Sequence, residues 1–206
     1  MLIEKVCEYL TKKIKNKMPE VDDERAEVIN YGLHLVIGEI PKNFILLLIA
    51  YILGILKLTV IAVISILPYR WSSGGFHLKT HLGCMTATSI FYMGNVFISK
   101  IIVFSNDYIK YMLVSAIWIF SAFMIRLYAP ADTENVPILR KKERKLKKIL
   151  SYITMTSTLI IGVIIKDNII SNILIFGTLI QTFSITRFAY KLTNNKYGYE
   201  GGEYIC

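Results

Sequence analysis

Charge is scarce in this sequence. Only 19% of its 206 residues are charged, whereas 54% are hydrophobic. A soluble domain of this length needs more polar side chains to cover its exterior. The apolar residues also lie in long blocks rather than at a regular period, and the mean hydropathy is +0.48. These features exclude an ordinary soluble domain and indicate a chain whose solvent is lipid.

Cysteine is scarce too, and the sequence has no CxxC pair. Cys7, Cys84 and Cys206 lie far apart along the chain, which excludes a disulfide framework and a cysteine-rich metal site. Because charges run through residues 1–18, an apolar leader is also missing, and we expect no cleavable signal peptide. A single cysteine in a polar segment at a membrane edge is instead a candidate nucleophile.

Acidic residues are fewer than basic ones, 15 against 24, and the net charge is +9. The Lys and Arg residues sit in short clusters between the apolar blocks. This distribution is typical of loops that face anionic lipid. We therefore expect membrane lipid, and no nucleic acid, as the partner of these clusters.

Seven helical elements are expected, all in one domain over residues 1–206. Within residues 1–20, apolar side chains recur at helical spacing opposite lysines, which predicts an amphipathic helix over 2–18 that lies on the membrane surface. Six apolar blocks follow, of which the first is short for a span and ends at Pro41. The blocks cover residues 26–40, 44–67, 84–104, 108–128, 150–165 and 169–190. The predicted fold is an all-α integral membrane protein with six membrane-associated helices plus an N-terminal amphipathic surface helix.

Charge also predicts the topology. If each of the six elements crosses the membrane from a cytoplasmic N-terminus, eighteen Lys and Arg residues fall inside and only Lys42, Lys110 and Lys166 fall outside. The other inside segments are the insert 68–84, the basic loop 129–148 and the polar tail 191–206, which we expect to be loose. This arrangement predicts a multi-pass protein of the cell membrane whose termini and polar insert face the cytoplasm.

The insert 68–84 holds the residues that can carry chemistry. They are Arg70, Gly74, Gly75, His77, His81 and Cys84. A cysteine attacks as the thiolate, so it needs a base or a cationic neighbour, and the two histidines are the available bases. Cys84 also follows Gly83 at the start of a predicted helix, where the helix dipole favours a thiolate.

The two histidines compete for the role of base. Seven residues separate His77 from Cys84, which on one straight helix is about 10 Å of rise, whereas proton transfer needs about 3 Å. Either the chain bends between them, or His81, one turn before Cys84, is the base. Two other interpretations stay open, namely Cys84 as a small buried apolar residue and a zinc site formed by both histidines and Cys84. The sequence has no HExxH motif, and we expect no cofactor.

Two charged residues outside the insert are further candidates for a role. Asp132 is expected as a turn residue after Pro130, with orientation of His77 as the alternative role. Lys57 lies in the middle of the 44–67 block, where a charge is costly unless it is paired, for example with Glu39, or lines a polar substrate cavity. Lys57 and the spans also support a different function, a small membrane transporter or peptide exporter. A membrane scaffold without chemistry is the remaining alternative.

The insert RWSSGGFHLKTHLGC resembles the signature of the accessory gene regulator B (AgrB) family of Gram-positive bacteria. That signature has an arginine, a Gly-Gly-aromatic-His core and a cysteine seven residues after the histidine. The segment YAPADTENVPI, residues 128–138, is similar to a second feature of the family. Phe76 stands where many members have tyrosine, and His81 is not part of the pattern. The length and the hydrophobic layout also match, so the resemblance covers most of the chain.

The resemblance implies a cysteine endopeptidase of the bacterial cell membrane. Members cleave the C-terminal part of a quorum-sensing autoinducing-peptide precursor, an AgrD-like chain, and promote its cyclisation to a thiolactone or lactone. His77 and Cys84 carry over as the catalytic residues, and Arg70, Gly74 and Gly75 as supporting residues of the signature. The expected partners are the precursor and membrane lipid, and a small bundle of this kind can also form a homodimer.

Overall fold

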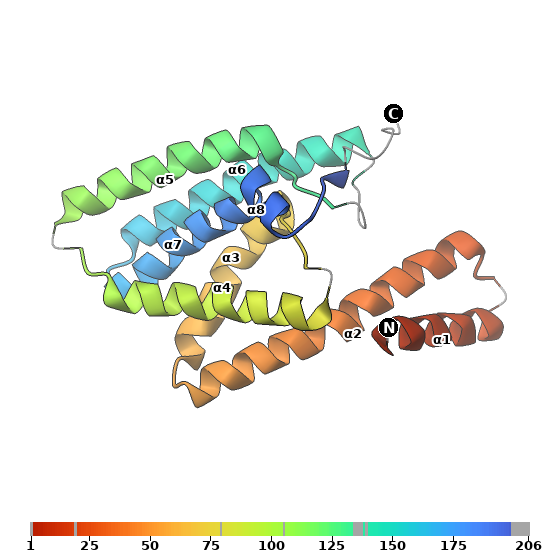
Figure 1. Cartoon of the computed structure of the whole chain (residues 1–206). Coiled ribbons are helices and arrows are strands. Elements are labelled where there is room, and N and C mark those ends of the chain that lie inside the picture. The colour runs from red at the N-terminus through yellow and green to blue at the C-terminus, as the bar shows by residue number, and fades with distance from the viewer. Residues whose placement is uncertain are drawn as a thin grey trace. The chain divides into compact units, whose positions relative to one another are not determined.

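The described part of the chain is all-helical, as predicted. The computed structural model describes residues 2–18, 20–78, 80–104, 106–133, 138 and 140–198. Within these residues it has eight α-helices (Figure 1) and one isolated β-bridge. The helices are α1 (Leu2–Lys17), α2 (Asp23–Ile52), α3 (Leu56–Ser73), α4 (His81–Ile101), α5 (Asp107–Tyr128), α6 (Lys141–Ile164), α7 (Asn168–Ser184) and α8 (Arg187–Leu192). The chain divides into two units, residues 1–53 and 54–206.

The first unit is a pair of helices. The predicted helix over residues 2–18 is confirmed as α1, which packs against α2. The Thr11 hydroxyl donates to Oδ1 of Asn30 over 3.3 Å, and Lys15 forms an ion pair with Asp23. Cys7 is buried, so an apolar face of α1 is used in packing. The position of α1 on a membrane surface stays a prediction.

Two predicted boundaries in this region are wrong. Pro41 does not end an element, because α2 continues through it to Ile52. A proline removes one backbone hydrogen bond, but neighbouring turns can carry the helix past it. The predicted span over residues 44–67 is also wrong, because the chain turns at Gly54 between α2 and α3. Apolar residues on both sides of this turn hid it in the sequence. Six long helices, α2 to α7, nevertheless remain.

Helix α7 is the centre of the second unit. It packs against α3, α4, α5, α6 and the short α8, and Figure 1 shows it alongside α6. Small and polar residues make these contacts: the Ser171 hydroxyl donates to the Gly162 carbonyl, and Asn95 donates to the Ile173 carbonyl over 3.0 Å. Close approach through small residues, combined with hydrogen bonds between helices, is typical of packing in lipid.

Among the described residues, three helical stretches are long and apolar enough to cross a membrane. They are Leu82–Ile101, Asp107–Tyr128 and Lys141–Ile164. Two shorter apolar stretches, Ile40–Ile52 and Asn168–Ser184, accompany them. These helices are consistent with a multi-pass membrane protein. Six crossings and a cytoplasmic site stay predictions.

The insert, the basic segment and the tail meet at one end of the second unit. The insert bonds to residue 131, the start of α6 bonds to residue 132, and the tail bonds to residue 77. A shared end is what the predicted topology requires of these three segments. The boundaries differ from expectation, since α3 continues into the insert to Ser73, α4 begins at His81, and residues 141–148 of the basic segment begin α6.

The prediction of a loose tail is wrong for residues 193–198. Tyr197 is only 2% exposed. Its ring stacks on that of Tyr190 with the ring centres 4.0 Å apart. Burial of this one aromatic ring explains why the segment docks, because the free energy gained by burying both faces of the ring exceeds the cost of ordering the polar residues around it. Residues 199–206, which include Cys206, lie outside the described residues.

Candidate active site

Two glycines shape the start of the insert. Helix α3 ends at Ser73, and Gly74 and Gly75 follow with φ of +72° and +141°. A Cβ on Gly74 would lie 2.3 Å from the Ala131 carbonyl oxygen. A Cβ on Gly75 would lie 2.2 Å from Nη1 of Arg70. Both the backbone angles and the lack of space therefore require glycine at these positions.

The two segments that carry the sequence resemblance are paired in space. The Gly75 amide donates to the Ala131 carbonyl over 2.9 Å, and the Ala131 amide donates to the Ser73 carbonyl over 2.8 Å. These two bonds form a short parallel bridge between the insert and the segment after α5. Tyr190 supports the bridge from α8, because its hydroxyl donates to the Ala131 and Asp132 carbonyls.

Arg70 holds the insert from the last turn of α3. Its Nη1 donates to the Ser184 hydroxyl over 3.0 Å, and its Nη2 donates to the Phe76 carbonyl over 2.8 Å. The planar guanidinium thus joins the end of α7 to the residue before His77. Arg70 acts on the backbone of the insert, which gives this residue of the signature a supporting role.

Gln181 is a supporting residue that the sequence analysis missed. Its side chain is fully buried in α7, and Nε2 donates to the Ser73 hydroxyl and the Gly74 carbonyl, both over 2.9 Å. Its signal was present in the sequence, because a glutamine inside an apolar block is costly unless it has partners. The partner could not be read from the sequence, since it is more than one hundred positions away.

Cys84 lies in the first turn of α4, as predicted. Thr80 caps this helix: its Oγ1 accepts from the Gly83 amide over 3.1 Å, and its carbonyl accepts from the Cys84 amide over 2.9 Å. The Cys84 side chain is partly exposed. A Thr cap therefore fixes where the helix begins and, with it, the place of the thiol.

His77 lies outside the helix, so the chain does bend between the two candidate catalytic residues. Its side chain is exposed, and its carbonyl accepts from Nδ2 of Asn195 over 2.8 Å. The spacing of a straight helix consequently does not apply to His77 and Cys84. His81 is the first residue of α4, but its side chain lies outside the described residues. Among the side chains that are described, no group of three metal ligands occurs, and the zinc interpretation, which needs His81, stays open.

Asp132 belongs to the connection between α5 and α6. Its Oδ2 accepts from Nη1 of Arg144 over 2.7 Å and from the Ile138 amide over 2.9 Å. The carboxylate side chain is 1% exposed, whereas that of Arg144 is 16% exposed. A largely buried ion pair of this kind fixes the start of α6. Asp132 therefore has a structural role near the turn, as the simpler interpretation expected.

Lys57 lies far from this site. It is an exposed residue in the first turn of α3, thirteen positions before Arg70, which is about 20 Å along the helix. The prediction of a lysine in mid-span was wrong because α3 begins only at Leu56. Backbone and side-chain bonds thus connect Arg70, Gly74, Gly75 and His77 within one anchored segment, and Lys57 lies outside this group. The pairing of His77 with Cys84 stays a prediction.

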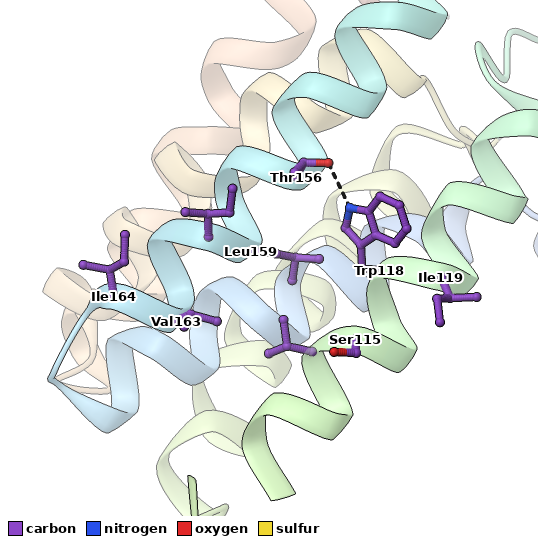
Figure 2. Close-up of a pocket in the computed structure, with 9 residues that line it drawn as sticks. Ser115, Trp118, Ile119, Thr156, Leu159, Val163 and Ile164 are labelled. Atoms are coloured by element: carbon purple, nitrogen blue, oxygen red, sulfur yellow. Dashed lines mark hydrogen bonds between the residues drawn. The ribbon is translucent and has the colours of Figure 1, made fainter. Parts of the chain in front are cut away.

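The described residues also form an apolar groove between α5 and α6 (Figure 2). Nine side chains line a cavity of about 480 Å³, and Nε1 of Trp118 donates to the Thr156 hydroxyl over 3.1 Å across it. Trp118 lies ten positions before Tyr128, or about 15 Å along α5, and the other lining residues lie on the same stretch of the two helices or farther from the insert. The groove is therefore separate from the site at the insert.

The chain resembles known proteins over nearly its whole length. The family model of accessory gene regulator B matches residues 3–185. An AgrB-like protein of Clostridium acetobutylicum is 28% identical over 200 residues, which cover 95% of this chain and 91% of the relative. An AgrB-like protein of Listeria monocytogenes is 29% identical over 197 residues, which cover 95% and 92%. No solved structure is significantly similar to the chain.

The matched range includes both segments that carry the motifs, the insert and residues 128–138, and the structure pairs these segments through backbone hydrogen bonds. It also includes all six long helices. The chain belongs to the AgrB family of membrane peptidases, which process autoinducing-peptide precursors.

Proposed function

We propose that the protein is a membrane-bound cysteine endopeptidase in which Cys84 is the nucleophile and His77 is the general base and acid. The observation that carries this proposal is the anchored loop between α3 and α4. Its start is held by Arg70 and by the bridge to Ala131, and its end is fixed by the Thr80 cap. A rigid support of this kind is what a catalytic pair on a loop needs, because small displacements of reacting groups cost large factors in rate.

The chemistry proceeds through one acyl intermediate. His77 takes the proton of the Cys84 thiol, and the thiolate attacks a peptide carbonyl of an AgrD-like precursor. The C–N bond then breaks, the leaving amine takes the proton from His77, and the N-terminal part of the precursor stays on Cys84 as a thioester.

Cyclisation follows by acyl exchange. A thiol within the bound peptide attacks the thioester and releases Cys84, which gives a thiolactone, and a hydroxyl in its place gives a lactone. The exchange of one thioester for another needs no energy source. Water must be kept from the intermediate, because hydrolysis would release a linear product. A site at the end of an apolar bundle suits that requirement.

The basic start of α6 supports the same substrate. Lys141, Lys142 and Lys145 are exposed and belong to the end of the second unit that also carries the insert. Positive charge at this end attracts acidic peptide segments as well as anionic lipid. We infer that the segment contributes to binding of the precursor and to anchoring at the membrane. The transporter alternative loses one support, because Lys57 is not in mid-span.

Co-expression with an AgrD-like precursor tests the proposal. Cys84→Ala and His77→Ala are expected to abolish cleavage, whereas Cys7→Ala and Cys206→Ala retain it, because neither of these cysteines belongs to the insert. The size of the precursor on a gel is the readout, and the amount of each variant in the membrane is the control. Normal cleavage by Cys84→Ala would overturn the enzyme assignment and favour a transporter, which needs no thiol.

A further inference from the structure

The C-terminal segment 193–198 begins with a defined helix end. Helix α8 stops at Leu192, and Asn194 adopts φ of +53°. The Asn194 amide donates to the Lys191 carbonyl over 3.2 Å, and the Asn195 amide donates to the Tyr190 carbonyl over 2.9 Å. This pair of bonds is the Schellman arrangement, in which asparagine is one of the few residues that tolerate a left-handed backbone. The backbone direction at Asn195 is thus set by the sequence Thr-Asn-Asn.

The Asn195 side chain points at the insert. Its Nδ2 donates to the His77 carbonyl over 2.8 Å and also to the Thr193 hydroxyl and carbonyl, over 2.8 and 3.2 Å. The bonds to Thr193 fix the amide in one orientation, with a donor aimed at His77. The family model ends at residue 185, so the family match assigns this segment no role.

Tyr197 fastens the segment on its other side. Its ring stacks on Tyr190 and on Tyr128, with the ring centres 4.0 and 5.8 Å apart. Its hydroxyl donates to the Ile185 carbonyl over 2.9 Å. Gly198 is also closely packed, because a Cβ at this position would lie 2.8 Å from Oδ2 of Asp132. Asn195 is therefore held between a helix end and a buried aromatic stack.

Two consecutive carbonyls of the insert therefore accept hydrogen bonds from side chains of two different elements. Arg70 of α3 binds the Phe76 carbonyl, and Asn195 of the C-terminal segment binds the His77 carbonyl. The His77 side chain itself is exposed. The two backbone bonds set the place of the His77 backbone, from which the imidazole extends.

We propose that Asn195 is a positioning residue for His77, and that the docked segment 193–198 controls the chemical step by holding the His77 backbone in place. The proposal rests on the proposed function, because it takes His77 to be the base of Cys84. It adds a residue that the signature 70–84 does not contain. A displacement of a catalytic group by about 1 Å can reduce the rate by about 100-fold, so loss of this bond is expected to reduce kcat by roughly 10- to 100-fold.

Three variants isolate the hydrogen bond. Asn195→Asp has nearly the same shape, but its ionised carboxylate cannot donate to the His77 carbonyl. Asn195→Ala removes the side chain. Asn194→Gly is the matched control. It removes an exposed side chain from the residue next to Asn195, and glycine accepts the left-handed backbone at this position. All variants are made in a Cys7→Ala, Cys206→Ala background and reconstituted in vesicles as full-length chains.

Alkylation of Cys84 by iodoacetamide is measured as a function of pH, together with kcat and KM for an AgrD-like precursor. With Asn195 intact, alkylation is expected to extend to lower pH than in His77→Ala. Asn195→Asp and Asn195→Ala are expected to shift the profile toward that of His77→Ala and to lower kcat, with KM changed less than about twofold because precursor binding is untouched. Asn194→Gly is expected to match the parent.

Two results would overturn this inference and leave the proposed function intact. They are Asn195 variants that match Asn194→Gly in both profile and kcat, and a loss of activity that only follows a loss of folded protein. A failure of the proposed function looks different, because His77→Ala would then leave the alkylation profile and cleavage unchanged while Asn195 is still present.

Discussion

Replacement of Gly74 by alanine tests whether the bridge between the insert and residue 131 supports activity. The new Cβ would lie 2.3 Å from the Ala131 carbonyl oxygen and 2.9 Å from the carbonyl carbon. Both are backbone atoms, so the overlap cannot be relieved by a side-chain rotation. The insert must move away from Ala131, and the bonds Gly75 to Ala131 and Ala131 to Ser73 are lost or lengthened.

The magnitude follows from two contributions. A non-glycine residue at φ of +72° with ψ of −150° costs about 1–3 kcal/mol. Two backbone hydrogen bonds add about 0.5–1.5 kcal/mol each. The total is about 2–6 kcal/mol. Even the lower end of this range, if it is expressed as displacement of the insert, corresponds to a roughly 30-fold lower rate of cleavage. Gln181 of α7 contacts the bridge at Ser73 and Gly74, but α7 also packs against α4, α5 and α6, so the bundle is expected to stay folded.

The assay compares three glycines. Precursor cleavage in vesicles and thermal unfolding in detergent are measured for Gly74→Ala, Gly75→Ala and Gly94→Ala. Gly75→Ala is expected to be milder, because its Cβ meets the ends of the Arg70 and Ser184 side chains, which can move. Gly94→Ala is the control, since nothing lies within 4 Å of its Cβ and alanine in a helix is favourable by about 0.5–1 kcal/mol. Equal cleavage by Gly74→Ala and Gly94→Ala would refute the role of the bridge.

Other expected outcomes concern the base, the membrane and the tail. His81→Gln is expected to retain most cleavage. A loss as deep as that of His77→Gln would favour His81 as the base or a metal site, and only the metal site predicts that an added chelator inhibits the parent protein. In a cysteine-free chain, an impermeant maleimide applied to intact cells is expected to label a cysteine at Asn106 and to spare one at Lys142, and the reverse result would overturn the cytoplasmic assignment. Tyr197→Ala is expected to lower the free energy of unfolding by about 3–5 kcal/mol, because a buried aromatic ring is lost. Tyr197→Phe keeps the stacked ring and is expected to lower it by only about 0.5–1.5 kcal/mol. Similar values for the two variants would show that stacking does not hold the segment.

The sequence predicted the parts of the fold that depend on local signals. The all-α class followed from the apolar blocks, α1 from its spacing, and the start of α4 from the glycine before Cys84 and the apolar run behind it. The break at Gly54 was not predictable, because apolar residues surround it and a glycine in an apolar block is ambiguous. Continuation of α2 through Pro41 was missed because a proline is a strong but not absolute helix breaker.

The candidate site divides in the same way. The residues of the insert were identified from their types and spacing, but their supports were not. Gln181 and Asn195 bind the backbone of the insert, and Ser184 binds the Arg70 side chain, in each case across more than one hundred positions. Such contacts leave no periodic pattern. The docked tail was mistaken for a loose one because its composition is polar, and a single buried Tyr197 decided its position.

Direct detection of an acyl-enzyme tests the central claim, that Cys84 is the nucleophile. The Cys7→Ala, Cys206→Ala chain in vesicles is mixed with an AgrD-like precursor, quenched in acid and analysed by mass spectrometry. A mass increase equal to the N-terminal part of the precursor is expected on the peptide that contains Cys84, and hydroxylamine is expected to remove it because a thioester is labile to this nucleophile. The claim would be contradicted if the precursor were cleaved without any adduct on Cys84 and if Cys84→Ala still cleaved it.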